Sequence, residues 1–409
     1  MSRFLIVLFV IIAISGLLEW YTFAGLRSRW NNWSSWLKIT TQVIYFALMA
    51  LAIISLISMF GFGGFGKAAR NFFFSFVMFN LFVKLTFAAF LFGDDIRRFF
   101  IWIKQMVQPA TVATEDGISR SDFMVKAGLI GASVPLVSLS YGMINGAYNY
   151  RVRKTSVQLP KLPAAFEGLK IVQISDIHAG SFYDREAVNR GIDMILEQKP
   201  DLIFFTGDLV NDSADEMDDY KDIFARLEAP LGVYSILGNH DYGDYTEWES
   251  EEAKAQNLER LKMTHAEMGW RLLLDEHVYL EKDSQQICLI GVENWGKGFH
   301  QQGDLKKAHE GSEGPVKLLL SHDPTHWDEQ VRKDYKDIDI TFSGHTHGAQ
   351  MGIETGGFKW SPISLRYKKW AGLYQEENQY LYINRGYGFL GYAGRLGILP
   401  EITVMELTT

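Results

Sequence analysis

Cysteine is almost absent from this chain of 409 residues. The one cysteine, Cys288, excludes an intrachain disulfide and a structural zinc site built from several thiolates. It stands in an apolar run between Ile287 and Leu289, which predicts a place in the protein core. Metal chemistry in this chain would therefore have to use oxygen and imidazole ligands.

Acidic side chains are scarce in the first part of the chain, and basic ones are in the minority in the rest. Residues 1–154 hold 15 Lys and Arg against 6 Asp and Glu, a net charge of +9. The remainder carries −17, which gives −8 for the whole chain. Because a nucleic-acid backbone favours a basic face, we expect no nucleic acid as the main partner.

Long apolar runs, by contrast, fill much of the first 150 residues. Four are long enough to cross a bilayer, at residues 4–18 (extended by aromatic residues to 23), 39–60, 72–92 and 128–147. The fourth is rich in small residues and could instead be a core helix. Aromatic clusters at 30–36 and 99–102 resemble the belts of membrane interfaces. We expect an all-α transmembrane region of about four spans over residues 1–150.

The basic residues between these spans bear on orientation. The linkers between spans one and two and between spans three and four carry eight Lys or Arg, against three on the opposite side. By the positive-inside rule, four spans then place the C-terminal domain outside the cytoplasm. A stretch at 119–126 that resembles a decayed twin-arginine export signal agrees. Arg151, Arg153 and Lys154 oppose this orientation.

After a linker expected at 151–164, strands and helices alternate. We expect strands at 169–175, 202–210, 232–237, 271–280, 286–292, 316–321, 340–343, 380–384 and 402–407. Helices are expected at 184–198, 215–227 and 246–269. A strand-heavy second half and a helix-bearing first half favour two sheets packed face to face, with helices outside.

Five of the expected strands end in residues that can bind a metal. These residues are Asp176, His178, Asp208, Asn239, His240, His322, His345 and His347. Each alone has an ordinary explanation as a helix cap, a turn residue or a surface histidine. Together they supply hard oxygen and imidazole ligands at one edge, which suits a pair of divalent ions with one bridging carboxylate.

The order Asp-x-His, Gly-Asp, Gly-Asn-His-Asp, His and Gly-His-x-His resembles the calcineurin-like metallophosphoesterase superfamily, over about residues 165–407. The membrane-anchored layout is similar to a bacterial branch of it. The resemblance implies a four-layer αββα domain over residues 165–409, a metal-dependent phosphoric ester hydrolase, and two divalent ions (Mn, Fe or Zn). One ion would take Asp176, His178, Asp208 and His347, and the other Asp208, Asn239, His322 and His345.

Residues around these blocks suggest further roles. His240, which we expect Asp241 to hold in place, is the candidate general acid because it lies beside a ligand. His300 and Arg395 are candidates for lining the substrate entrance. The segment 357–374 mixes Trp and Leu with Lys and Arg, and is either a loop that caps the fold or an element that meets a membrane surface.

The expected function is hydrolysis of a phosphodiester or phosphomonoester of a lipid or envelope substrate by a membrane-anchored enzyme. One alternative is a pyrophosphatase of the UDP-2,3-diacylglucosamine type in glycolipid (lipid A) synthesis, which requires a domain that faces the cytoplasm. Relatives with that activity commonly carry arginine where this chain has His240. The other alternative, a non-catalytic metal-bound scaffold, would need a missing ligand, and none is missing.

Overall fold

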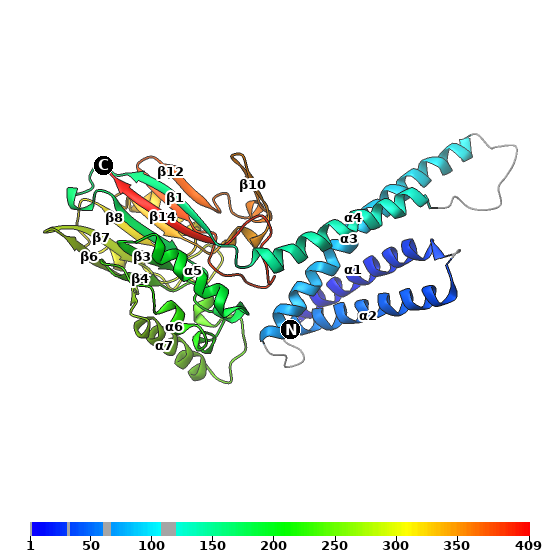
Figure 1. The fold of residues 1–409 in the computed structure, drawn as a ribbon, viewed down its shortest axis with the longest axis horizontal. Coiled ribbons are helices and arrows are strands. Elements are labelled where there is room, and N and C mark those ends of the chain that lie inside the picture. The colour runs from blue at the N-terminus through cyan, green and yellow to red at the C-terminus, as the bar shows by residue number, and fades with distance from the viewer. Residues whose placement is uncertain (1, 31–32, 60–66, 108–119) are drawn as a thin grey trace. The chain divides into compact units, whose positions relative to one another are not determined.

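Long apolar helices form the N-terminal unit of the chain, Met1–Tyr141. The computed structural model describes residues 2–30, 33–59, 67–107 and 120–409. In these residues the unit has α1 (Ser2–Arg27), α2 (Ser35–Met59), α3 (Lys67–Val107) and α4 (Asp122–Tyr141) (Figure 1). Each is long and apolar enough to cross a membrane, and the fourth apolar stretch runs on to Gly146. The predicted multi-pass transmembrane region is confirmed.

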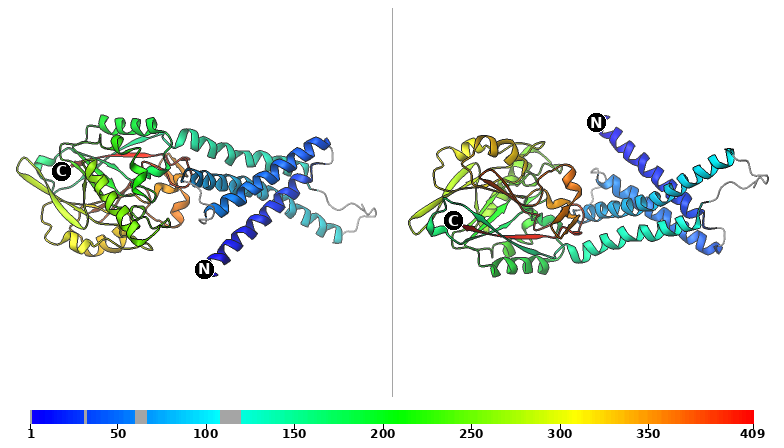
Figure 2. Two further views of the ribbon diagram at one scale, coloured as in Figure 1. Left: turned by 90° about the horizontal axis from the view of Figure 1, so that it is seen from below. Right: turned by 90° about the horizontal axis from the view of Figure 1, so that it is seen from above.

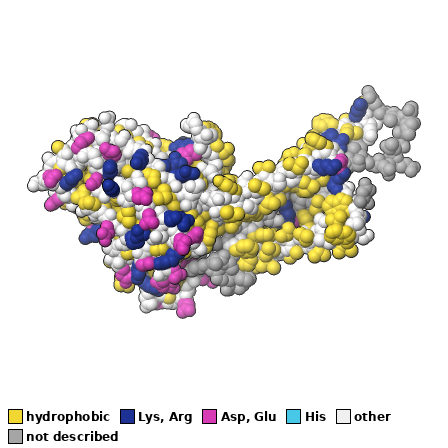
Figure 3. Space-filling view, in the orientation of Figure 1, with side chains coloured by type: hydrophobic (Ala, Val, Ile, Leu, Met, Phe, Trp, Pro, Cys, Tyr) yellow, Lys and Arg dark blue, Asp and Glu magenta, His cyan; other side chains and the backbone are white. Residues whose placement is uncertain are grey.

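The helices of this unit turn hydrophobic side chains outward. Phe9, Trp36 and Ile130 are examples of large apolar residues that are mostly exposed. In the space-filling view, hydrophobic atoms cover the described helices of this unit, whereas charged side chains are spread over the C-terminal unit (Figure 3). A helix that is apolar all round requires an apolar surrounding, which here is lipid.

Helix α3 is longer than a bilayer requires. Its 41 residues span about 60 Å, roughly twice the hydrocarbon thickness. Beyond Lys84, the next charged residues are Asp94, whose carboxylate accepts from Arg97 at 2.7 Å, and Asp95, which pairs with Arg98 at 3.0 Å. The predicted span at 72–92, in which Lys84 is the single charged residue, therefore lies just before these pairs.

Two six-stranded sheets form the C-terminal unit, Gly142–Thr409. The first has, in spatial order, β1 (Arg151–Gln158), β14 (Glu401–Thr408), β2 (Leu169–Ile174), β3 (Leu202–Thr206), β4 (Val233–Ile236) and β5 (Arg271–Leu272). The second has β12 (Gly372–Glu376), β13 (Gln379–Ile383), β9 (Ile340–Ser343), β8 (Lys317–Leu320), β7 (Gln285–Gly291) and β6 (Glu276–Lys282). A separate hairpin pairs β10 (Ile353–Thr355) with β11 (Phe358–Trp360).

Alternate residues of the strands face two different cores. Phe204 lies between the sheets, where its ring is 5.0 Å from that of Phe342, while Phe205 turns to the opposite face of the first sheet. There α5 (Arg185–Glu197), α6 (Lys221–Phe224) and α7 (Glu251–Glu267) cover it. On the outer face of the second sheet, Leu319 and Cys288 pack with Trp327 and α8 (Leu305–His309). Helices flank the sheets in both views of Figure 2, so the predicted αββα layering is confirmed.

Three local predictions were wrong. The linker expected at 151–164 contains β1, which joins the first sheet parallel to β14. Polar residues occur on both faces of this edge strand, and of its eight residues only Val157 is buried, so the apolar alternation is weak. The helix expected at 215–227 is a 3₁₀ turn (Ala214–Met217) followed by the short α6, because Tyr220 between them leaves helical geometry. The strand expected at 271–280 divides at Asp275, which has φ of +53°, so that β5 and β6 belong to different sheets.

Candidate metal centre

Parallel strand ends bring the predicted ligands to one edge of the two sheets. β2, β3 and β4 are parallel neighbours, as are β8 and β9, so their carboxyl ends point the same way within each sheet. The ligand candidates follow these ends by two to four residues. Five have a left-handed backbone: Asp176, His178, Asp208, His345 and His347, with φ between +49° and +71°. Such conformations are costly for residues other than glycine, and they concentrate at functional sites.

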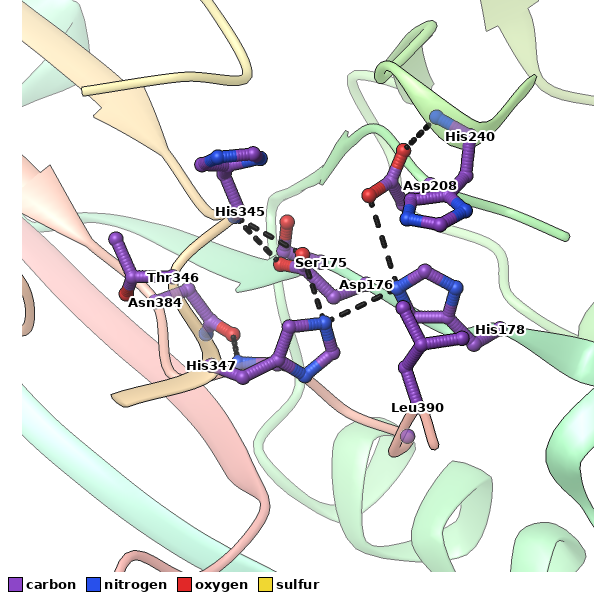
Figure 4. A network of polar contacts seen from close by, with 12 residues as sticks. Ser175, Asp176, His178, Asp208, His240, His345, Thr346, His347, Asn384 and Leu390 are labelled. Atoms are coloured by element: carbon purple, nitrogen blue, oxygen red, sulfur yellow. Dashed lines mark hydrogen bonds and ion pairs between the residues drawn. The ribbon is translucent and has the colours of Figure 1, made fainter. Parts of the chain in front are cut away.

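Asp176, His178 and His347 form the first ligand group. One donor atom from each lies within 4.8 Å of the others. The Nε2 atoms of His178 and His347 are 3.0 Å apart, and Nε2 of His347 is 3.3 Å from Oδ1 of Asp176 (Figure 4). All three side chains are buried. The two imidazoles therefore converge on the point that the carboxylate also faces.

Asp208, His322 and His345 form the second ligand group. Nε2 of His322 lies 3.1 Å from Oδ2 of Asp208, and its Nδ1 donates to the carbonyl of Thr206 at 2.7 Å. The side-chain oxygen of Asn239 is 2.8 Å from Nδ1 of His345. Oδ2 of Asp208 is also 3.6 Å from Nε2 of His178, so this carboxylate adjoins both groups.

The donor set fits divalent cations. Burial lowers the pKa of His178 to about 3 and that of His345 to about 4, which keeps both imidazoles neutral, the form that binds metals. Burial also raises the pKa of Asp176 to about 6, so a positive charge nearby would favour its ionised form. Since Nδ1 of His322 donates to the Thr206 carbonyl, its Nε2, which faces the Asp208 carboxylate at 3.1 Å, is the ring nitrogen left to serve as a ligand.

His240 lies beside the two groups without belonging to either. Its backbone N–H donates to Oδ1 of Asp208 at 2.8 Å, and its Nδ1 is 2.8 Å from the carbonyl oxygen of Asn211. Since a carbonyl only accepts, Nδ1 carries the proton and Nε2 is left for other partners. The ring centroids of His240 and His178 are 4.9 Å apart.

The expected contact between Asp241 and the His240 ring was wrong. The Asp241 carboxylate accepts the backbone N–H groups of Gly238, Asp208, Leu209 and Val210, at 2.8–3.3 Å. It is fully buried. Asp241 therefore holds together the loops after β3 and β4. The carbonyl of Asn211, in place of the Asp241 carboxylate, binds the His240 ring.

The two candidates for the substrate entrance have different environments. His300 lines a cavity of about 530 Å³ together with Asn239, Tyr245 and Phe299, next to the second ligand group. Arg395 is buried, with Nη2 3.2 Å from Nδ1 of His347 and Nε 2.8 Å from the carbonyl of Gly388. The expectation that Arg395 lines the entrance was wrong, because it packs behind a ligand candidate.

Two polar contacts of the second group were not foreseen. The hydroxyl of Tyr367 lies 2.9 Å from Nε2 of His345, and that of Tyr245 accepts from Nδ2 of Asn239 at 2.9 Å. Tyr245 follows the Gly-Asn-His-Asp block closely enough to have been considered. Tyr367 lies 22 residues from its partner in a segment without a regular pattern, so only the folded chain shows it.

This fold, with two clusters of Asp and His at one edge of its sheets, defines a metal-dependent phosphoric ester hydrolase. Residues 169–349 match the family described as Calcineurin-like phosphoesterase. Residues 2–147 match the family described as Probable Calcineurin-like phosphoesterase, transmembrane domain. The chain therefore carries a domain that matches the calcineurin-like phosphoesterases, preceded by one that matches the transmembrane domain of the second family.

Similar proteins occur in a vertebrate and in bacteria. The "Transmembrane protein with metallophosphoesterase domain" of Danio rerio is 29% identical over 347 residues, 81% of this chain and 72% of the relative. "Phosphodiesterase YaeI" of Escherichia coli (strain K12) is 28% identical, covering 58% of this chain and 82% of its own length. "UDP-2,3-diacylglucosamine pyrophosphatase LpxG" of Chlamydia muridarum is 28% identical, covering 61% and 86%.

Proposed function

We propose that this membrane protein hydrolyses a phosphodiester or phosphomonoester of a lipid or another envelope component, with two divalent ions, Mn, Fe or Zn. The observation that carries the proposal is the position of Asp208 between the two ligand groups. The ions would be held by Asp176, His178, Asp208 and His347, and by Asp208, Asn239, His322 and His345. When bound, such a pair neutralises phosphate oxygens and lowers the pKa of a bound water.

His240 is the proposed general acid in this reaction. With Nδ1–H donating to the Asn211 carbonyl, Nε2 is the atom that, in the protonated imidazolium, can give its proton to the leaving oxygen, which leaves the ring neutral. The backbone bond from His240 to Asp208 ties the acid to the shared carboxylate. The substrate's leaving group would then extend into the cavity that His300 and Phe299 line.

The proposal is tested with the purified full-length protein and a soluble aryl phosphodiester. We expect a chelator to abolish hydrolysis and Mn²⁺ to restore it. Activity that survives removal of metal, verified by elemental analysis, would refute the metal-dependent mechanism.

A second candidate is pyrophosphate hydrolysis of a nucleotide-activated glycolipid. Similarity to the chlamydial pyrophosphatase favours it. It requires a cytoplasmic site, whereas the linker charges favour an extracytoplasmic one. Assay of the same purified protein on UDP-2,3-diacylglucosamine distinguishes the two: release of UMP supports the second candidate.

A further inference from the structure

The hairpin of β10 and β11 turns its apolar face outward and its charged face toward the protein. Residues opposite each other on the two strands share a face, and the pairs are Ile353 with Trp360, Thr355 with Phe358, and Glu354 with Lys359. On one face, Ile353, Phe358 and Trp360 are 54%, 59% and 45% exposed. A soluble hairpin would bury such a face against the protein.

The charged face of this hairpin is the one that binds the protein. Glu354 accepts from Arg153 at 2.6 Å and from Arg385 at 2.7 Å. The ammonium group of Lys359 donates to the carbonyl of Ala371 at 2.5 Å and to the hydroxyl of Tyr374 at 3.1 Å. These contacts hold the hairpin with its apolar face outward, so the exposure of that face is not a consequence of a loose strand pair.

Hydrogen bonds connect the base of the hairpin to the end of the fourth apolar stretch. Gly142, inside the stretch that ends at Gly146, accepts from the backbone N–H of Arg395 at 3.1 Å. The next residue, Leu396, bonds to Gln350 at 2.8 Å and to Gly352 at 2.9 Å. Ile353 follows at once. Ile353 therefore lies next to residues that are hydrogen-bonded, through Arg395 and Leu396, to the last residues of the fourth apolar stretch.

The segment after β11 continues the apolar surface and ends in basic residues. Leu365 is 88% exposed, and Arg366 and Lys368 beyond it are exposed as well. Between these two, Tyr367 contacts His345 at 2.9 Å, so this surface adjoins the second ligand group. Exposed apolar residues beside Arg and Lys match the chemistry of a bilayer surface with anionic phosphate headgroups.

We infer that Ile353, Phe358, Trp360 and Leu365, here called the docking face, insert into the headgroup region of the bilayer that holds the four helices. The docking face brings the edge with the ligand groups to the level of lipid phosphates. This inference concerns a surface and stands apart from the proposed reaction, although it would explain how a lipid ester reaches the site.

Fluorescence quenching tests the inference on the full-length protein. Phe358→Cys is labelled with an environment-sensitive dye, and the native Cys288 is buried and does not compete. The protein is placed in nanodiscs of phosphatidylethanolamine and phosphatidylglycerol with or without a lipid that bears a nitroxide near the headgroup. We expect the nitroxide to reduce the emission at least about twofold, as for a group buried a few ångströms in the interface.

Met263→Cys is the matched control, because Met263 is an apolar residue of α7 that is 58% exposed. Its dye should keep its emission. Equal emission changes at the two positions would overturn the inference. It would also be overturned if the dye on Phe358→Cys were quenched by a nitroxide placed on a second copy of the protein or on a protein partner, and not by the nitroxide lipid.

A second measurement separates this inference from the proposed function. We expect Phe358→Ser/Trp360→Ser to keep its activity on a soluble aryl phosphodiester, and to lose at least about tenfold on a fluorescent phosphodiester lipid in the nanodisc. Quenching of the dye in a protein that hydrolyses neither substrate would support the docking face and refute the phosphoesterase proposal. Equal activity of variant and parent on the lipid would count against a role of the docking face in substrate access.

Discussion

Asp208 is the residue that adjoins both groups of candidate ligands. Asp208→Asn keeps the shape of the side chain but removes the charge between His178 and His322. We expect metal content to fall below two ions per chain and kcat/KM for an aryl phosphodiester to fall at least about 10²-fold. Asp193 lies on α5 in an exposed ion pair with Arg226, so Asp193→Asn is the control and should be unaffected. Full activity with two ions bound would refute the shared carboxylate.

His240 is expected to affect proton transfer rather than metal binding. His240→Asn should lower turnover by about 10²–10⁴-fold while metal content is unchanged, because only the leaving-group proton is lost. The defect should shrink for a nitrophenyl ester, whose leaving group is a weak base. Activity profiles over a series of leaving groups measure this. A loss that is uniform over the series, or a loss of metal, would make His240 a structural residue or a ligand.

At the scale of single elements, α7 buries a histidine that gains no polar contact. Neither ring nitrogen of His265 has a hydrogen-bond partner among the described residues, and its ring faces those of Phe205 and Trp270. Burial lowers the pKa of His265 to about 3. Below pH 6.5 the unfolded chain binds a proton at this histidine, whereas the folded chain does not. The free energy of unfolding therefore falls progressively as the pH is lowered from 6.5 towards 3.

His265→Leu should therefore flatten the acid side of the stability profile. The free energy of unfolding of the parent should fall by up to about 1.4 kcal/mol per pH unit more steeply than that of the variant. Thermal melting in detergent between pH 7 and 4 measures the difference. Coinciding slopes would show that His265 is protonated in the folded protein.

The packing of α1 against α3 includes an ion pair inside the apolar region. Lys84 donates to Oε1 of Glu19, and Asn80 donates to the same oxygen at 3.2 Å. Removing one partner leaves a buried charge, which costs about 3–5 kcal/mol. We expect Lys84→Met to lower the melting temperature of the full-length protein and its yield in the membrane. Glu19→Gln/Lys84→Met should recover most of the loss, and equal melting of all three proteins would contradict a buried pair.

At the scale of the whole molecule, the side of the membrane on which the domain lies decides the substrate. We predict an extracytoplasmic domain, because eight Lys or Arg on two linkers outnumber three on the other side. Alkaline phosphatase fused after Thr409 should be active, and a fluorescent protein at the same place should be dark. A bright fluorescent fusion with inactive phosphatase would refute this and favour the nucleotide-activated glycolipid.

The layers, and the edge at which the candidate ligands gather, could be predicted because each depends on local pattern. Apolar runs give the strands, and a polar residue just after such a run, as at Asp208, lies at a sheet edge wherever parallel strands end together. Partners distant in sequence could not be predicted. The contacts of Asp241 with the β3 loop and of Arg395 with His347 depend on how far loops fold back, which no periodicity encodes.

Strand β14 lies between β1 and β2, parallel to one and antiparallel to the other. It is synthesised long after both neighbours, because more than 220 residues separate the end of β2 from the start of β14. Both neighbours therefore keep unpaired backbone edges until β14 emerges from the ribosome, and the first sheet cannot close before then. A chain broken off before β14 would be inserted in the membrane yet carry two unpaired strand edges, a form suited to capture by chaperones or membrane proteases.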